Sequence, residues 1–321
     1  MEISVVVASR PNRDPKECLR TAVTADRLGY NELWIGEGWV WDPFALATAI
    51  GMAIEHSTLT VGPIPVSVRD PAIIAMSAAS TAALSGQRVG VALGTSSVRF
   101  VEGLHGRTRY RPVTALAESA QAVRSLMSGE QTDFAGAVLS THGYRLRLDP
   151  PGGQLTVAAF GDKAIATAAS YADRMVLDLV SPAMVRRYRA KLDAAAEEAG
   201  RPSPTLAAWI PAAVDPDPES LGELMSSLAG YLEVAGYGEM FTAAGFGRAV
   251  ELAQEGATHD ELIAAMPDDA ARNIGLVGDV DAIRARLDEY AAAGLDEIVL
   301  DPATAGDPGA ERTLSALARF L

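Results

Sequence analysis

Two short polar turns could bind a negatively charged ligand. Gly94-Thr95-Ser96-Ser97 and Phe160-Gly161-Asp162-Lys163 each separate a short apolar run from a segment with helical periodicity. Backbone amides and hydroxyls at the start of a helix bind phosphate and carboxylate groups. If the two turns follow neighbouring strands, they could hold one extended phosphorylated ligand. Ser, Thr and Asp are also common helix N-caps, so ordinary capping is the alternative for both turns.

Glu37 is the one carboxylate directly after the second predicted strand, and Trp34, Trp39 and Trp41 flank it. Apolar walls raise the pKa of a carboxyl group, so Glu37 could move a proton or hydrogen-bond the polar edge of a ring. The alternative is a Glu37 side chain that a neighbouring arginine neutralises. The tryptophans could stack on a planar ligand or simply pack together.

Several other chemistries lack the residues that they need. The four histidines are scattered along the chain and none ends a predicted strand, which disfavours a catalytic metal. Lys163 opens a predicted helix, so a Schiff-base lysine is not expected. The single cysteine, Cys18, falls within a predicted helix, which argues against a thiol nucleophile.

The composition excludes several classes of protein. The chain has 321 residues, 27 basic against 41 acidic side chains and a formal net charge of -14. This charge disfavours nucleic acid and anionic membranes as partners, although a local site could still bind an anionic small molecule. One cysteine, no recognisable signal peptide and no apolar run of about 18 residues together predict a cytoplasmic protein.

Short apolar runs alternate with amphipathic helical segments along most of the chain, which is the pattern of a parallel sheet. Strands are predicted at residues 3–8, 33–36, 59–66, 89–93, 155–159, 174–177, 206–214 and 297–300. Helices are predicted at residues 15–28, 43–54, 71–84, 111–127, 163–171, 182–199, 279–293 and 309–321. This alternation predicts a (β/α)8 TIM barrel that forms a single domain over residues 1–321.

Two segments lie outside this alternation. Residues 133–148 predict a small hairpin, and residues 218–275 hold several helices without a strand, which indicates a helical insertion after strand seven. A doubly wound dinucleotide-binding sheet is the alternative fold, but the fingerprint GxGxxG is missing after the first strand. Active sites of TIM barrels lie at the carboxyl ends of the strands, where both polar turns and Glu37 are expected.

The third predicted strand contains an unusual segment, Gly62-Pro63-Ile64-Pro65-Val66. Its two prolines remove amide donors from a central strand, and such a segment is tolerated at a bulge or at a strand end. A bulge would move the backbone toward the barrel mouth, and X-Pro bonds accept the cis form that a sharp bulge can need. A strand that merely ends at Gly62 is the alternative.

Several motifs resemble those of the bacterial-luciferase-like flavin and deazaflavin oxidoreductases. They follow the order of that family and cover nearly the whole chain, at residues 25–37, 70–74, 84–89, 91–94, 128–130, 134–136 and 277–283. Residues 229–232, Tyr237 and Phe241 are most similar to the branch that uses coenzyme F420. That branch includes methylenetetrahydromethanopterin reductases and many actinobacterial enzymes.

The resemblance implies a barrel that holds a deazaflavin at its mouth and is usually a homodimer through helices two and three. It implies that a bulge at Gly62, Pro63 and Ile64 supports the ring, often with a non-prolyl cis peptide, and that the two polar turns bind the phosphate and tail. The residues then expected to face the substrate are Ser9, Trp39, Trp41, Phe100, Phe160 and Trp209. Small side chains that could pack between subunits, or within one, are Ala75, Ala78, Ala79 and Ala82.

The leading hypothesis is hydride transfer between C5 of the deazaflavin and a small organic substrate. An FMN-dependent monooxygenase is the second hypothesis, and a non-catalytic flavin or deazaflavin carrier is the third. Many family members carry a histidine where this chain has Gly38, and the methanogen reductases carry a strand-one glutamate where it has valines. The proton donor therefore stays open among Glu37, a water molecule and another residue.

Overall fold

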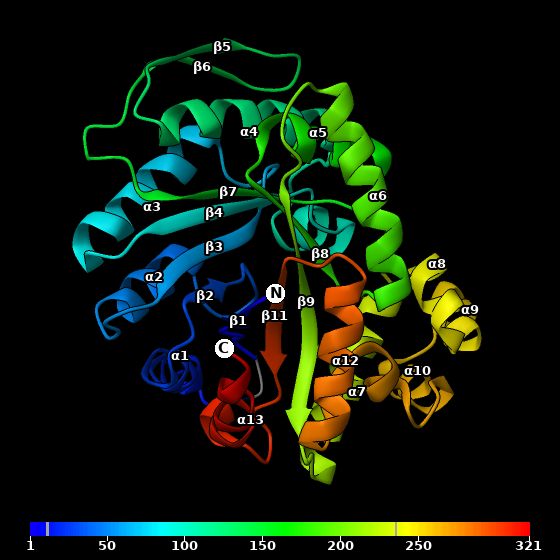
Figure 1. The fold of residues 1–321 in the computed structure, drawn as a ribbon. Coiled ribbons are helices and arrows are strands. Elements are labelled where there is room, and N and C mark those ends of the chain that lie inside the picture. The colour runs from blue at the N-terminus through cyan, green and yellow to red at the C-terminus, as the bar shows by residue number, and fades with distance from the viewer. Residues whose placement is uncertain (11–12, 235) are drawn as a thin grey trace.

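The computed structural model describes residues 1–10, 13–234 and 236–321, and eight of its parallel strands close into a barrel (Figure 1). In the order of pairing they are β1 (Glu2–Val6), β2 (Glu32–Ile35), β3 (Thr58–Pro65), β4 (Val89–Gly94), β7 (Gly152–Ala158), β8 (Arg174–Asp178), β9 (Thr205–Val214) and β11 (Glu297–Pro302). β11 also pairs with β1, so the ring is complete. The predicted (β/α)8 barrel is therefore confirmed.

Helices pack on the outside of the barrel, between successive strands and after the last one. They are α1 (Glu17–Leu28), α2 (Pro43–Gly51), α3 (Pro71–Ser85), α4 (Pro112–Met127), α5 (Asp162–Tyr171), α6 (Pro182–Glu198), α7 (Pro218–Leu232), α12 (Val280–Ala292) and α13 (Glu311–Leu317). Asp42 and Asp70 cap α2 and α3, and a proline follows each cap, so the local sequence fixes where these helices begin. Among the described residues, no helix combines the length and apolar character that a membrane span requires.

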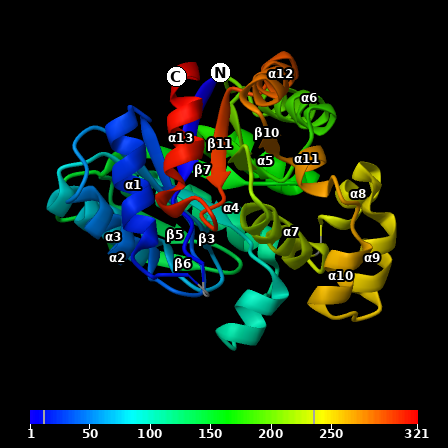
Figure 2. The ribbon, with the colours of Figure 1, turned by 90° about the horizontal axis from the view of Figure 1, so that it is seen from below.

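The segment after β9 holds the helical insertion. α7 leads to α8 (Gly238–Phe241), η2 (Thr242–Phe246), α9 (Gly247–Gln254), α10 (His259–Ala265) and α11 (Ala270–Ile274). Figure 2 shows α8, α9 and α10 grouped beyond α7, to one side of the barrel. A short strand that the sequence analysis did not predict, β10 (Leu276–Gly278), pairs with β9 outside the closed ring. The hairpin consists of β5 (Thr132–Ala135) and β6 (Ser140–Tyr144).

The bulge predicted in the third strand is present. Val61 pairs with Val91 and Ile64 with Leu93, so β3 has one more residue than β4 between these two pairs. The pairing continues to Pro65, which excludes a strand that ends at Gly62. The bond between Gly62 and Pro63 is cis, and it is a prolyl bond rather than the non-prolyl one that the resemblance implied.

An ion-pair network fills the N-terminal end of the barrel interior. Arg174, at the start of β8, donates to Glu297 (2.6 Å) and to Glu32 (2.7 Å). Its guanidinium lies 4.3 Å from the centre of the Trp34 ring, and Trp34 itself donates to Glu297. Because the interior of a protein disfavours isolated charges, these groups depend on one another. No local sequence pattern predicts this network.

The alanines of α3 pack within one subunit. Ala75 and Ala79 are fully buried in a cluster with Leu126 and Leu146. These alanines therefore pack within the chain, which is one of the two roles expected for them, the other being packing between subunits. The large exposed apolar side chains of this helix are Ile73, Met76 and Leu84.

Candidate active site at the barrel mouth

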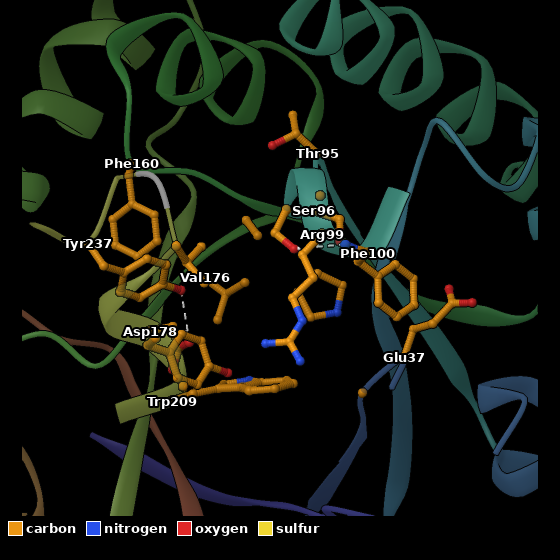
Figure 3. Close-up of a pocket in the computed structure, with 18 of the residues that line it drawn as sticks. Glu37, Thr95, Ser96, Arg99, Phe100, Phe160, Val176, Asp178, Trp209 and Tyr237 are labelled. Atoms are coloured by element: carbon orange, nitrogen blue, oxygen red, sulfur yellow. Dashed lines mark hydrogen bonds between the residues drawn. The ribbon is translucent and has the colours of Figure 1, made fainter. Parts of the chain in front are cut away.

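A cavity of about 530 Å³ opens at the carboxyl ends of the strands (Figure 3). This volume falls within the ~300–1,000 Å³ typical of small-molecule sites. The lining residues that the sequence analysis proposed are Glu37, Trp39, Pro63, Gly94, Thr95, Ser96, Ser97, Phe100, Phe160 and Trp209. The insertion adds a wall that the sequence analysis did not place here, with Ser227, Gly230, Tyr231, Val234 and Tyr237.

Arg109 holds the polar turn that follows β4. Its Nε donates to the Thr95 carbonyl oxygen (3.3 Å), and its Nη2 donates to Thr95 Oγ1 (3.1 Å). Ser96 has a left-handed backbone (φ 54°), and the Ser97 hydroxyl accepts from the Phe100 amide. The next helix is only the six-residue η1 (Arg99–Leu104), so the turn offers amides, hydroxyls and arginines rather than the dipole of a long helix.

The second polar turn follows β7, which pairs with β4, so the two turns are neighbours as expected. Phe160 lines the cavity described above and also a second one of about 910 Å³, which Gly161 and Asp162 line. The Asp162 carboxylate lies 2.5 Å from Lys191 Nζ, which holds its pKa below the usual range. Lys163 is exposed and lines neither cavity.

Glu37 forms an ion pair with an arginine, the alternative that its sequence context left open. Arg69 donates to Glu37 through both Nε (3.0 Å) and Nη2 (2.9 Å), and it also contacts Asp42. The Glu37 side chain is only 6% exposed. A bidentate contact of this kind fixes the position of the carboxylate, so Glu37 suits the positioning of a ligand.

Aromatic side chains form the apolar walls of the cavity. Trp39 packs edge-on against Phe100, with ring centres 5.3 Å apart, and Trp209 packs edge-on against Trp34 at 5.7 Å. Two residues expected to face the substrate do not line this cavity. These are Ser9 and Trp41, and the Trp41 indole instead donates to the Pro15 carbonyl oxygen (3.0 Å).

Asp178, the last residue of β8, is the carboxylate with the most perturbed environment in the cavity. The Tyr237 hydroxyl donates to Asp178 Oδ2 (2.9 Å), and Tyr231 also lies close enough to stabilise the charged carboxylate. Burial, which outweighs these hydrogen bonds, and the nearby Asp301 raise the pKa of Asp178 to about 7. Sequence reasoning missed this residue because it ended the strand at residue 177.

A second layer of charges lies beside Asp178. Arg10 contacts Asp301 Oδ1 through Nη2 (3.0 Å) and Glu223 Oε1 through Nε (2.6 Å). Burial raises the pKa of Asp301, and Arg10 partly offsets that effect. Arg10 therefore has two carboxylate partners of its own and does not pair directly with Asp178 in this arrangement.

The cavity fits a flat organic cofactor better than a metal. A Cβ on Gly94 would lie 3.1 Å from Pro63 Cβ, so glycine lets β4 approach the bulge closely. The Trp209 Nε1 donor is buried and meets no acceptor within the described ranges, which leaves a hydrogen-bond donor for a polar ring atom. No three His, Cys, Asp or Glu side chains group as metal ligands in the part of the chain that the structure describes.

Comparisons with known proteins show the family of the chain and its fold. Residues 1–297 match the model of the family described as luciferase-like monooxygenase. A putative coenzyme F420-dependent oxidoreductase of Mycobacterium tuberculosis is 25% identical over 94% of both chains. The coenzyme F420-dependent tetrahydromethanopterin reductase of Methanopyrus kandleri shares the fold, with a TM-score of 0.84, 17% identity and coverage of 99% and 98%. The oxygenating constituent of 3,6-diketocamphane monooxygenase from Pseudomonas putida, solved with FMN, has a TM-score of 0.72, 17% identity and coverage of 99% and 97%.

Proposed function

The chain belongs to the luciferase-like monooxygenase family, and on that basis we propose that this oxidoreductase transfers a hydride between C5 of coenzyme F420 and a small organic substrate. The observation that carries the proposal is the cavity at the barrel mouth, which joins the bulged β3 to a polar turn and aromatic walls. The F420-dependent relative, similar over 94% of the chain, supports this choice of coenzyme.

The residues of the chain would hold the coenzyme in an extended pose. Pro63, backed by Gly62 and Ile64, would support the ring, and the turn from Gly94 to Ser97 would bind the phosphate beside Arg109. When bound, the deazaflavin supplies a carrier for a hydride. The protein then has to orient the ring, keep water from one face and provide a route for a proton.

The second cavity favours F420 over FMN. It adjoins the first at Phe160 and Val234. Its charged lining residues are Arg187, the paired Lys191 and Asp162, and the carboxylates Glu233 and Glu239. FMN ends at its phosphate, whereas F420 continues into a tail that needs space beyond that point, and the second cavity provides this space. An FMN-dependent monooxygenase is the second candidate, because the Pseudomonas putida protein holds FMN on the same fold. A carrier without turnover is the third.

Titration with the coenzyme tests this proposal. Deazaflavin fluorescence is expected to be quenched saturably when the purified protein is added, and FMN is expected to bind at least tenfold more weakly, a difference of about 1.4 kcal/mol. A matching rise of the thermal midpoint with F420 would support specific binding. Absence of quenching, or tighter binding of FMN, would contradict the choice of coenzyme.

Two glycine variants test whether the coenzyme binds in the cavity at the barrel mouth. Gly94→Leu fills the space between β4 and the bulge, since even a Cβ there lies 3.1 Å from Pro63, and it should abolish quenching. Gly222→Leu makes the same change at a position where a Cβ meets nothing within 4 Å and which does not line the cavity. Its binding curve should match that of the unmodified protein.

The exposed face of α3 is the proposed homodimer contact. Ile73, Met76 and Leu84 are 40%, 43% and 68% exposed and lie on one stripe of the helix. We expect light scattering to give about twice the chain mass of 33.6 kDa, and Met76→Glu to give a monomer, because a buried unpaired charge opposes association. Val23→Glu, at a similarly exposed apolar side chain on α1, should leave the mass unchanged. A monomeric unmodified protein would exclude the dimer.

A further inference from the structure

We propose that Asp178 is the residue that exchanges a proton with the substrate, and that the substrate is an alcohol or amine, or the corresponding carbonyl or imine. This inference rests on the proposed hydride transfer. When a carbon bearing oxygen or nitrogen gains or loses hydride, the heteroatom gains or loses a proton, so the cavity needs a group that can hold that proton.

The position of Asp178 suits this role. It lies at the carboxyl end of β8 and lines the same cavity as Trp209 and the β4 turn. Figure 3 shows the Tyr237 hydroxyl directed at Asp178, with Trp209 beside them. Because the tyrosine proton is committed to the carboxylate, the tyrosine oxygen can accept from a substrate. Asp178 and Tyr237 thus form a short relay with both ends at the cavity.

The charges around Asp178 leave it free to change protonation state. The titratable and charged groups that face it are Tyr231 and Tyr237 from the insertion, Asp301 from β11, and behind Asp301 the Arg10 and Glu223 side chains. The charge of Asp178 raises the pKa of Tyr231, and burial raises that of Tyr237, in both cases well above the usual value, so the tyrosines stay neutral. At neutral pH both forms of Asp178 are populated, since its pKa is about 7. Glu37, by contrast, is fixed by Arg69.

When the substrate is an alcohol, it is oxidised and the deazaflavin is reduced. The C–H bond breaks, and its electron pair leaves with the hydrogen as hydride to the oxidised deazaflavin. The O–H bond also breaks, its proton passes to an Asp178 oxygen directly or through Tyr237, and the C=O double bond forms. In the reverse direction protonated Asp178 returns the proton to the oxygen as hydride reaches the carbon. For an amine the same steps leave a C=N bond.

The first test needs neither coenzyme nor substrate. In the purified protein with ¹³C-labelled aspartate carboxyls, one signal should titrate near pH 7 and should be absent from Asp178→Asn. Tyr237→Phe should move that transition to higher pH, because the tyrosine hydrogen bond lowers the pKa of Asp178. A carboxyl of Asp178 that titrates in the ordinary aspartate range, or a transition that Tyr237→Phe leaves unmoved, would overturn the inference.

The second test uses oxidised F420 with a panel of secondary alcohols and secondary amines. Asp178→Asn should bind F420 as tightly as the unmodified protein, lower kcat by roughly 10²–10⁴-fold and lose the break near pH 7 in kcat/KM. Asp288→Asn, at an exposed carboxylate on α12, should change neither quantity. Because the pKa of Asp178 is raised in the folded state, its ionisation costs the folded protein stability as the pH rises from the unfolded pKa to about 7. Asparagine carries no charge, so the thermal midpoint of Asp178→Asn at pH 8 should not fall.

The outcomes separate the two proposals. A protein that binds neither F420 nor FMN would overturn the proposed function and this inference with it. A protein that binds F420 while Asp178→Asn reacts at the unmodified rate would overturn the inference alone. Bound F420 that no member of the panel reduces would overturn the proposed substrate class.

Discussion

Replacing Arg174 with methionine is expected to lower the free energy of unfolding by about 3–5 kcal/mol, because it leaves the buried Glu297 and the half-buried Glu32 without a cation. Arg174 and Glu297 are 3% and 5% exposed, and their charged atoms are 2.6 Å apart. Glu32 contacts the other guanidinium nitrogen. Methionine keeps a long apolar side chain, so the loss reports the charge rather than a large cavity. Urea unfolding at pH 8 measures the effect.

The loss should also depend on pH. Burial raises the pKa of Glu297, and Arg174 opposes that rise. Without Arg174 the pKa of Glu297 in the folded state moves higher still, so the variant loses stability as the pH rises from the unfolded pKa through the folded one. The difference between variant and unmodified protein is therefore larger at pH 8 than at pH 5.

Arg124→Met is the matched control for the Arg174 variant. The Arg124–Asp173 pair is half-buried, with side chains 38% and 33% exposed, and solvent screens it. Its removal is expected to cost at most ~1 kcal/mol. Equal losses in the two variants, or a loss at Arg174 that is the same at both pH values, would show that the buried network does not carry the predicted energy.

The barrel could be predicted from sequence because its signals are local. Apolar runs, first-turn prolines and cap residues such as Asp42 and Asp70 each specify their own element within a few residues. The buried network has no such signal: Arg174 is 142 positions from Glu32 and 123 from Glu297. Only closure of the sheet brings these three residues together, so their pairing follows from the fold and not from a motif.

The residues of the candidate site also divide into those that the sequence predicts and those that it does not. Pro63, Gly94 and Trp209 line the cavity because strand ends gather at the mouth of a barrel, which is a property of the fold class. Trp41 also lies near a strand end, but its side chain turns to a backbone carbonyl of the loop before α1. Asp178 gains its environment from Tyr237, in an insertion whose position over the barrel no strand pattern specifies.

The remaining large effect is expected at Gly62, where alanine should lower the free energy of unfolding by about 3–5 kcal/mol and abolish F420 binding. Gly62 has φ +127°, a conformation that L side chains rarely adopt, and a Cβ there would lie 2.2 Å from the Ala92 carbonyl oxygen. This contact is with the backbone of β4, so no side chain can move aside. Relief requires β3 and β4 to separate where Pro63 lines the cavity.

Gly86→Ala separates the two causes of the loss expected for Gly62→Ala, which are the left-handed backbone strain and the clash with β4. Gly86 ends α3 with φ +76°, but a Cβ there meets nothing within 4 Å, so alanine adds only the left-handed strain of about 1–2 kcal/mol. Urea unfolding and F420 quenching should therefore show a mild loss of stability with intact binding for Gly86→Ala, and a severe loss of both for Gly62→Ala. If Gly62→Ala instead matches Gly86→Ala in stability and binds F420 normally, then the bulge tolerates a side chain, and its close approach to β4 does not shape the coenzyme site.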